Sequence, residues 1–139
     1  MDIIDAHFAA ENAADIPAIL ATYTDDVYWE DTTLSLGILH GRRAVGVAYA
    51  NLMSILDDLH LESTWRVHST NTVIDESVVT GRVVGSIGGV TGGGTAVHFR
   101  LLHVFEIRDG LICGETAWYD TGGIIRQIQA AGASGRGQG

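Results

Sequence analysis

Asp120 is the first candidate for chemistry, because it directly follows an apolar segment of the chain. Residues 112–119 have the apolar and aromatic content of a strand, and a short helix is predicted at 122–128. A carboxylate at the end of an apolar strand can line a cavity, where low dielectric raises its pKa toward the range useful for proton transfer. Aspartate is also a preferred N-cap residue. A catalytic site and a helix cap both remain open interpretations of Asp120.

Three further ionisable residues share a face with apolar residues if alternate strand positions point the same way. They are Asp31, Arg82 and His103, on three different predicted strands, and on the last strand Trp118 falls on the same face as Asp120. Singly, each has a structural explanation: a loop cap, an outer-face cation and a hydrogen-bonded core histidine. Together they predict ionisable groups converging in one apolar cavity, since buried unpaired charge is costly and marks functional sites. A single β-bulge in one of these strands would turn the residues beyond it to the opposite face of the sheet.

Other kinds of site are not indicated. His98 and His103 lie five residues apart on one strand and so face opposite sides, and His60 and His68 complete no convincing ligand set. A nucleophilic serine would need Gly-x-Ser-x-Gly, which does not occur, and the glycines at 88–94 lack the lysine and the following helix of a phosphate-binding loop. We therefore predict no metal and no cofactor.

Composition limits the class of protein. The 139 residues, 46% of them hydrophobic, are enough for one domain with a core. A formal charge of −9 argues against nucleic acid or an anionic membrane as partner. No apolar run approaches the roughly 18 residues of a membrane span, and residues 1–5 do not resemble a signal peptide. The single cysteine, Cys113, fits a reducing compartment. We expect a cytoplasmic protein that binds a small organic molecule.

The predicted elements give an α+β fold. Helices are expected at 2–14, from Asp15 onward and at 42–58, and strands at 27–31, 61–70, 72–87, 95–107 and 111–119, with a turn at 24–26. Tight turns between long strands predict a mostly antiparallel sheet, with three helices from the N-terminal half over its concave face and an apolar pocket between them. We assign residues 1–131 to one domain and predict that the glycine-rich residues 132–139 form a disordered tail.

Both faces of the sheet are rich in apolar residues, which predicts an oligomer. Leu102 and Val104 lie on the opposite parity to His103. An open sheet face of this kind is rarely left in water. We therefore predict a homodimer formed through the outer face of the sheet.

Several segments carry a resemblance to a known family. Residues 15–20, 23–31 and 40–45 resemble the opening of the nuclear-transport-factor-2-like superfamily. Residues 105–112, 119–120 and 124–128 are similar to the closing pattern of its SnoaL-like polyketide cyclases. The resemblance covers about residues 4–129. It implies a cone-shaped α+β barrel, dimeric or larger, that works without metal or organic cofactor.

The resemblance also suggests roles for residues. In the cyclases, the aspartate at the position of Asp120 is the acid and base of an intramolecular aldol closure, assisted by a strand histidine for which His103 is the nearest match. In the ketosteroid isomerase relatives the base matches Asp31. In the limonene-epoxide hydrolase relatives, Arg82 and Asp120 match two of three key residues, and Val84 replaces the third.

We therefore expect a cofactor-independent enzyme that cyclises or isomerises an apolar carbonyl compound of polyketide, terpenoid or steroid-like type. Asp120 would remove a proton next to the carbonyl, and His103 or Arg82 would stabilise the enolate. The expected pocket walls are Trp29, Tyr49, Phe99 and Trp118. Two alternatives stay open: an epoxide hydrolase or hydratase, with Asp120 activating water that Arg82 orients, and a non-catalytic binding or assembly domain.

Overall fold

The computed structural model describes residues 2–136, which form four helices and eight strands. The helices are α1 (Ile3–Asn12), α2 (Ile16–Ala21), α3 (Arg42–Ile55) and α4 (Thr121–Arg136). The strands are β1 (Tyr23–Asp31), β2 (Leu39–His40), β3 (Leu56–His68), β4 (Thr72–Val83), β5 (Ser86–Ile87), β6 (Val90–Thr91), β7 (Thr95–Arg108) and β8 (Leu111–Tyr119).

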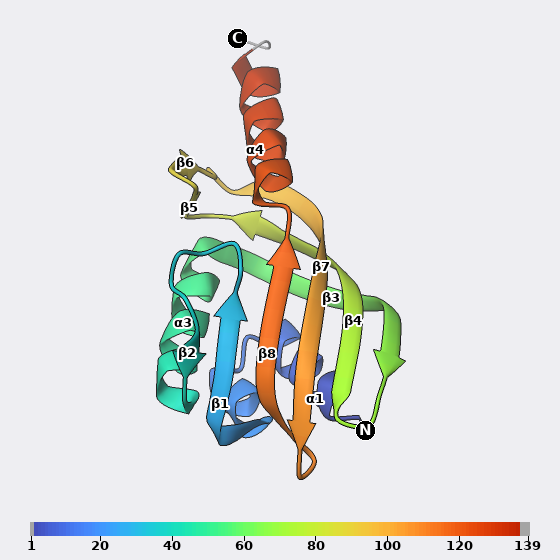
Figure 1. Cartoon of the computed structure of the whole chain (residues 1–139). Helices are drawn as coiled ribbons and strands as arrows, with labels where there is room; N and C mark the ends of the chain where they lie inside the picture. Colours follow the sequence, from blue (N-terminus) through green and yellow to red (C-terminus); the bar gives the residue numbers. More distant parts are fainter. Residues whose placement is uncertain (1, 137–139) are drawn as a thin grey trace.

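Six of the strands form one mixed sheet, in the order β2-β1-β8-β7-β4-β3. β1 runs parallel to β8, and every other neighbouring pair is antiparallel. Figure 1 shows α1, α2 and α3 on one side of this sheet, while α4 projects beyond the end of β8. The predicted α+β class and the three helices over one face are confirmed. Closure of the sheet into a cone-shaped barrel stays a prediction.

Local sequence explains where the first helices begin. The Asp2 carboxylate accepts a hydrogen bond from the amide of Ile4 at 3.0 Å and caps α1. The Asp15 carboxylate accepts one from the amide of Ala18 at 3.1 Å and caps α2, as its position before a proline suggested. α3 follows Gly41, whose φ of +86° favours glycine. Residues 24–26, predicted as a turn, belong to β1 instead.

The C-terminal helix differs from expectation in length. α4 runs to Arg136, so residues 132–136 of the segment predicted to be disordered are helical, and residues 137–139 lie outside the described part. Ile124 and Ile128 of α4 are buried against Val83 and Val97, in a small core of their own. This packing holds the first two turns of α4, and it explains why the helix starts directly after β8.

A β-bulge in β8 reverses the predicted parity of the last strand. Glu106 of β7 pairs with Gly114, but Ile107 pairs with Ile112, so Cys113 is an extra residue on β8. Beyond the bulge Glu115, Ala117 and Tyr119 face the interior, and the intervening residues face outward. The predicted inner position of Trp118 is therefore wrong, since its side chain lies on the outer face and is 43% exposed.

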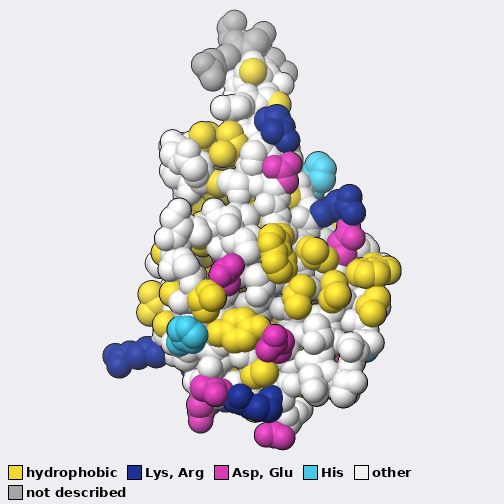
Figure 2. Space-filling view, viewed as in Figure 1, with side chains coloured by type: hydrophobic (Ala, Val, Ile, Leu, Met, Phe, Trp, Pro, Cys, Tyr) yellow, Lys and Arg dark blue, Asp and Glu magenta, His cyan; other side chains and the backbone are white. Residues whose placement is uncertain are grey.

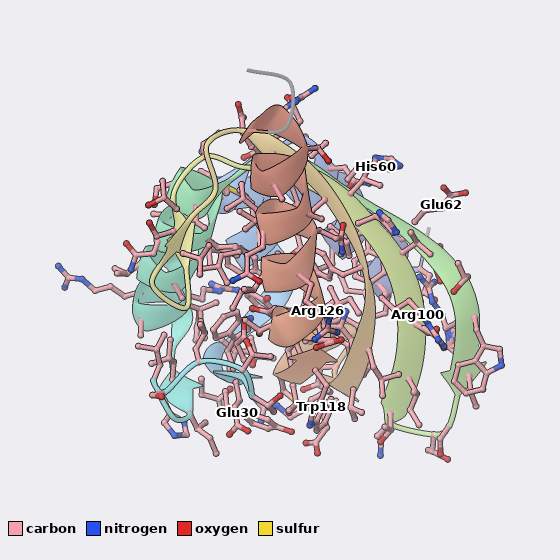
Figure 3. All side chains as sticks on the ribbon, turned by 90° about the horizontal axis from the view of Figure 1, so that it is seen from above. Glu30, His60, Glu62, Arg100, Trp118 and Arg126 are labelled. Carbon is pink, nitrogen blue, oxygen red and sulfur yellow. The ribbon has the colours of Figure 1, made fainter. Side chains whose placement is uncertain are left out.

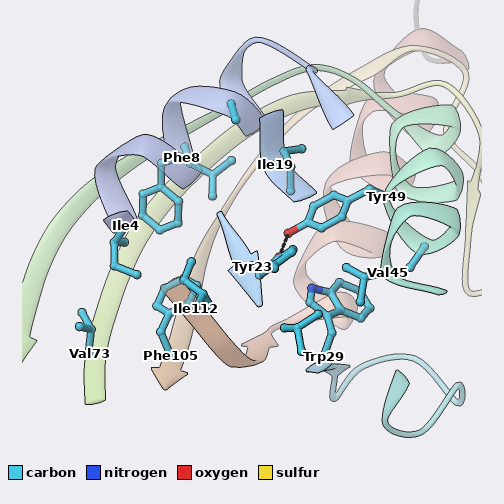
Figure 4. Close-up of a cluster of buried hydrophobic side chains, with 14 of the residues drawn as sticks. Ile4, Phe8, Ile19, Tyr23, Trp29, Val45, Tyr49, Val73, Phe105 and Ile112 are labelled. Carbon is cyan, nitrogen blue, oxygen red and sulfur yellow. Dashed lines mark hydrogen bonds between the residues drawn. The ribbon is translucent and has the colours of Figure 1, made fainter. Parts of the chain in front are cut away.

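The outer face of the sheet carries exposed apolar side chains. Figure 2 shows them gathered over β8, β7, β4 and β3. Trp118 and Leu102 are cross-strand neighbours, and the other large members are Trp65, Val67 and Val78. In Figure 3, viewed from above, Trp118 points away from the helices. The inner face packs instead against α1 to α3, where Ile4, Phe8, Tyr23, Phe105 and Ile112 form the centre of the main core (Figure 4).

Candidate active site

A cavity opens between the helices and the inner face of the sheet. Its inner part has a volume of about 50 Å³, and the outer part beside it has about 340 Å³. Six residues line both parts: Trp29, Asp31, Leu52, Leu56, Phe99 and Tyr119. The side chains of the inner wall that carry polar groups are Glu11, Trp29, Asp31, Tyr49, His103, Glu115 and Tyr119, and the remaining wall is apolar. The outer part has the size of a small-molecule site.

Five of the eight predicted site residues line this cavity. They are Trp29, Asp31, Tyr49, Phe99 and His103. The parity count was correct on β1 and β7 because neither strand is interrupted near these residues. The expected cluster of four ionisable residues does not form, because Asp120 and Arg82 lie elsewhere.

Asp120 caps a helix at the surface. Its Oδ1 accepts a hydrogen bond from the Gly123 amide at 3.0 Å, and its Oδ2 lies 3.3 Å from Nη2 of Arg126. The side chain is 71% exposed. Of the two interpretations that the sequence left open, the structure therefore supports the helix cap. The bulge in β8 explains the difference, because it shifts the alternation by one residue and Tyr119, rather than Trp118 or Asp120, faces the cavity.

Arg82 points outward from β4. Its Nη1 donates to the carbonyl oxygen of Gly94 at 3.3 Å, and its Nε lies 3.6 Å from Oδ2 of Asp58. The side chain is 54% exposed. The inward residues of β4 are its alternate ones, which include Val79 and Val83. The predicted inward orientation of Arg82 is therefore wrong, because the inward residues of β4 are its neighbours Gly81 and Val83.

Glu115 is the centre of the buried polar groups. Oε1 accepts a hydrogen bond from the Tyr23 hydroxyl at 2.9 Å, and Oε2 accepts one from the Trp29 indole at 2.8 Å. The Tyr49 hydroxyl donates to Oε2 at 3.3 Å, and Nε2 of His7 lies 3.2 Å from Oε1. Burial disfavours the charged carboxylate, but His7 and these donors more than offset it and lower the pKa of Glu115 to about 2. Glu115 is therefore ionised.

His7 is the counter-ion of Glu115. The Thr22 hydroxyl donates its one proton to the carbonyl oxygen of Ile19 at 2.6 Å, so it must accept a proton from Nδ1 of His7, 2.9 Å away. Nε2 faces Glu115 and needs the second proton. Burial lowers the pKa of His7, but Glu115 and Glu11 outweigh it, and the net direction is upward. His7 and Glu115 form a buried ion pair.

Glu11 is the second carboxyl group beside His7, and its environment is the opposite of that of Glu115. Oε1 lies 3.8 Å from Nε2 of His7, and Oε2 is buried with no hydrogen-bond partner among the described residues. Burial and the Glu115 charge raise the pKa of Glu11 to about 7, against the opposing effect of His7. A carboxyl group on the cavity wall can thus donate or accept a proton near neutral pH.

His103 presents a second unpartnered atom on the same wall. Its ring stacks on Phe105, with centroids 4.9 Å apart, and its Nε2 lies 3.8 Å from Oε2 of Glu115. Nδ1 is buried and has no hydrogen-bond partner in the described chain. Burial lowers the pKa of His103, although Glu115 opposes this, so the imidazole is neutral at pH 7. The Glu115 charge favours the proton on Nε2, which leaves the lone pair on Nδ1.

Asp31 lies where the inner and outer parts of the cavity meet. Oδ2 accepts a hydrogen bond from the Tyr119 hydroxyl at 2.8 Å. Oδ1 accepts from the amide of Thr33 at 2.9 Å and from its hydroxyl at 2.6 Å. Burial and the Asp31 charge raise the pKa of Tyr119, so the phenol keeps its proton and remains a donor.

Comparison with known families agrees with this architecture. The family model of the SnoaL-like domain matches residues 4–115, which is most of the chain. The chain belongs to the SnoaL-like family. No match was found among curated proteins.

Solved structures of the same fold come from several bacteria. A protein assigned as a polyketide cyclase from Xanthomonas campestris is 24% identical with a TM-score of 0.80, and the match covers 91% of this chain and 93% of that one. A second polyketide cyclase assignment, from Silicibacter sp., gives 24% identity, a TM-score of 0.80 and coverage of 91% and 92%. A protein with a ketosteroid isomerase-like fold from Catenulispora acidiphila, in complex with trimethylamine, is 17% identical with a TM-score of 0.80, and the match covers 92% of both chains. At these identities the likeness establishes the fold.

Sequence reasoning missed three members of this SnoaL-like site: His7, Glu11 and Glu115. On α1 the signal was present, because Glu11 follows Ile4 and Phe8 at helical spacing and so falls on the apolar face. A search for polar residues on apolar faces that included helices would have found it. Glu115 was hidden by the bulge, which no pattern in the sequence reveals.

Metal-binding groups and membrane-spanning helices are both absent from the described residues. Residues 2–136 contain no group of three or more His, Cys, Asp or Glu side chains placed to hold a metal ion. No helix within this range is both long and apolar enough to cross a membrane. The cytoplasmic location stays a prediction.

Proposed function

We propose that this SnoaL-like protein is a cofactor-independent enzyme that moves a proton on the carbon next to a carbonyl group of an apolar substrate. Such chemistry serves intramolecular aldol cyclisation or isomerisation of polyketide, terpenoid or steroid-like compounds. The observation that carries the proposal is the pair Glu11 and His103. Both side chains are buried on one cavity wall, each has an unpartnered atom, and their pKa values are shifted in opposite directions.

In the proposed reaction, His103 is the base and Glu11 the acid. The body of the substrate occupies the outer part of the cavity, and its carbonyl end enters the inner part, which has room for a few atoms. Nδ1 of His103 takes the proton from the α-carbon, and the C–H electron pair forms the C=C bond of an enol. The carbonyl oxygen takes the proton of the Glu11 carboxyl group, which becomes a carboxylate.

The second half returns both protons. In an isomerisation, His103 gives its proton to a different carbon, and Glu11 recovers its own from the enol hydroxyl. In an aldol closure, the enol carbon attacks a second carbonyl of the same molecule and the new alkoxide takes the proton from His103. The first carbonyl re-forms as its enol hydroxyl returns the proton to Glu11. Neither route changes the oxidation state of the substrate or needs a co-reactant.

Glu115 acts through His103 as a positioning residue. Its carboxylate lies on the Nε2 side of the His103 ring, at 3.8 Å, and so favours the tautomer with a free Nδ1. The same charge stabilises the imidazolium that forms when His103 takes a proton. The His7 ion pair and the hydroxyl donors keep Glu115 ionised throughout.

The hydrolase alternative loses its water-orienting residue, because Arg82 and Asp120 both lie at the surface rather than on the cavity wall. The non-catalytic alternative is separated from the proposal by experiment. Exchange of α-hydrogens for deuterium in D₂O, followed by NMR on a panel of apolar cyclic ketones, detects enolisation before any natural substrate is known.

Three variants make the exchange experiment specific. His103→Asn removes the base and Glu11→Gln removes the transferable proton with little change in shape, and each should lower the exchange rate by at least roughly 10²-fold. Asp120→Asn is the matched control, since it neutralises an exposed carboxylate that caps a helix, and it should leave the rate unchanged. No exchange above buffer with wild-type protein, or equal rates in wild type and His103→Asn, would contradict the proposal.

A further inference from the structure

The cavity wall carries one buried carboxyl group, Asp31, that has no cation beside it in the described chain. Three carboxyl groups line the inner part: Glu11, Asp31 and Glu115. Glu115 and Glu11 both lie beside His7, at 3.2 Å and 3.8 Å from its Nε2. Asp31 is 6% exposed and is bonded to Tyr119 and Thr33 alone, with no ion pair in the described chain. A buried carboxylate without a counter-cation is costly and calls for a compensating partner.

Permanent cations are absent from both parts of the cavity. The chain contains eight arginines and no lysine. None of the arginines in the described part of the chain lines either part of the cavity. His103 is the one basic side chain on the described wall, and burial lowers its pKa, so it is uncharged at pH 7. A ligand with a carboxylate or phosphate would find no permanent cation on the described wall to bind it.

Two donors at the junction of the two parts are already engaged. The Tyr119 hydroxyl donates to Asp31, and the Trp29 indole donates to Glu115. At the junction, the groups that remain for a ligand are the carboxylate oxygens of Asp31 and the ring faces beside them. Phe99 and Tyr119, with centroids 5.4 Å apart and an angle of 37° between their planes, stand with Trp29 and Asp31 at the junction of the two parts. Aromatic faces beside a carboxylate attract a cation.

We infer that the substrate of this cavity carries a cationic nitrogen, an ammonium group on an apolar body. The ammonium lies against Asp31 at the junction, among Trp29, Phe99 and Tyr119. The carbonyl end of the same molecule extends to Glu11 in the inner part. The inference rests on the proposed function in taking this cavity as the substrate site, and it adds the charge class of the substrate. The net charge of −9 attracts such a molecule at long range.

A matched set of ketones tests the charge class by binding alone. The cation 4-(trimethylammonio)cyclohexanone and the neutral 4-tert-butylcyclohexanone have nearly the same shape, and 4-oxocyclohexanecarboxylate supplies the anion. Isothermal titration of wild-type protein at pH 7 should give about tenfold tighter binding of the cation than of its neutral isostere. The anion should bind more weakly than either. Equal affinity for the isosteres, or tighter binding of the anion, would overturn the inference without any variant being made.

Asp31→Asn locates the effect. It removes the charge and keeps the shape, so it should abolish most of the preference for the cation while binding of the neutral ketone changes little. Asp120→Asn removes one surface charge and should keep the preference. If the preference survives in Asp31→Asn, the assigned position is wrong. The proposed function is tested separately by α-deuterium exchange of the same ketones, so either can fail while the other holds.

Discussion

α1 joins two buried polar clusters that are built in opposite ways. Near its start, Asp75 is fully buried, and its oxygens accept hydrogen bonds from Arg66, Ser63 and Ser77. Arg66 also bonds Asp5 at 2.8 Å, which ties α1 to β3. None of these residues lines the cavity between the helices and the sheet.

The cluster at the other end of α1 leaves atoms without partners. Glu11 and His103 both line the cavity and each has one buried atom without a hydrogen-bond partner among the described residues, although Glu115 beside them is fully bonded. Burial of charge is thus common to both regions and does not identify a site. The difference lies in unsatisfied atoms on residues that line a cavity, because such atoms have a free energy to gain from a ligand.

Removal of Arg66 should have the largest effect on stability. Arg66→Met keeps an unbranched apolar side chain but removes the guanidinium, which lies over the Phe8 ring, and leaves Asp75 buried without its cation, at a cost of about 3–5 kcal/mol in the free energy of unfolding. Urea denaturation measures this loss. The α-exchange rate per folded molecule should stay at the wild-type level. A large loss of that rate in well-folded protein would show that the two clusters are coupled.

Glu11 should make stability depend on pH in the opposite sense to an ordinary carboxylate. Its pKa is raised from 4.5 to about 7, so between these values the folded state holds more protons than the unfolded state. The stabilisation is complete below pH 4.5 and is lost as pH rises through 7, with a size on the order of 2–3 kcal/mol.

The difference between wild type and Glu11→Gln isolates this effect, because His7, His103 and Glu115 titrate in both proteins. Unfolding free energies from urea titration at pH 4.5 and 7.5 should show wild type losing stability relative to the variant as pH rises. A constant difference across this range would mean that Glu11 has an ordinary pKa in the folded protein.

The predicted dimer interface lies on the outer face of the sheet, so changes there should leave the cavity unaffected. A homodimer through this face would bury Trp118 and Leu102, which are now 43% and 37% exposed. Sedimentation at micromolar concentration should give about twice the monomer mass of 14.8 kDa. Trp118→Glu should shift the protein to monomer with little change in the α-exchange rate. A monomer mass for the wild-type protein would contradict the predicted homodimer.

The fold was predictable from sequence to a larger extent than the site. Periodicity located the three N-terminal helices and the long strands, and parity placed Asp31 and His103 correctly because each lies in a regularly paired part of its strand. Asp120 and Trp118 were misplaced because one extra residue at Cys113 turns the following side chains over. The raised pKa of Glu11 depends first on burial and then on Glu115, and both conditions exist only in the folded protein.

The most direct test of the proposed acid–base pair is the pH dependence of α-exchange in wild type and Glu11→Gln. The reaction needs a protonated Glu11 and a neutral His103, so the wild-type rate should fall as pH rises above about 7, where Glu11 loses its proton. It should also fall toward acid pH, as His103 takes up a proton. In Glu11→Gln the slower rate should no longer fall on the alkaline side. An alkaline decline that persists in Glu11→Gln, or a wild-type rate that rises through pH 8, would contradict the account.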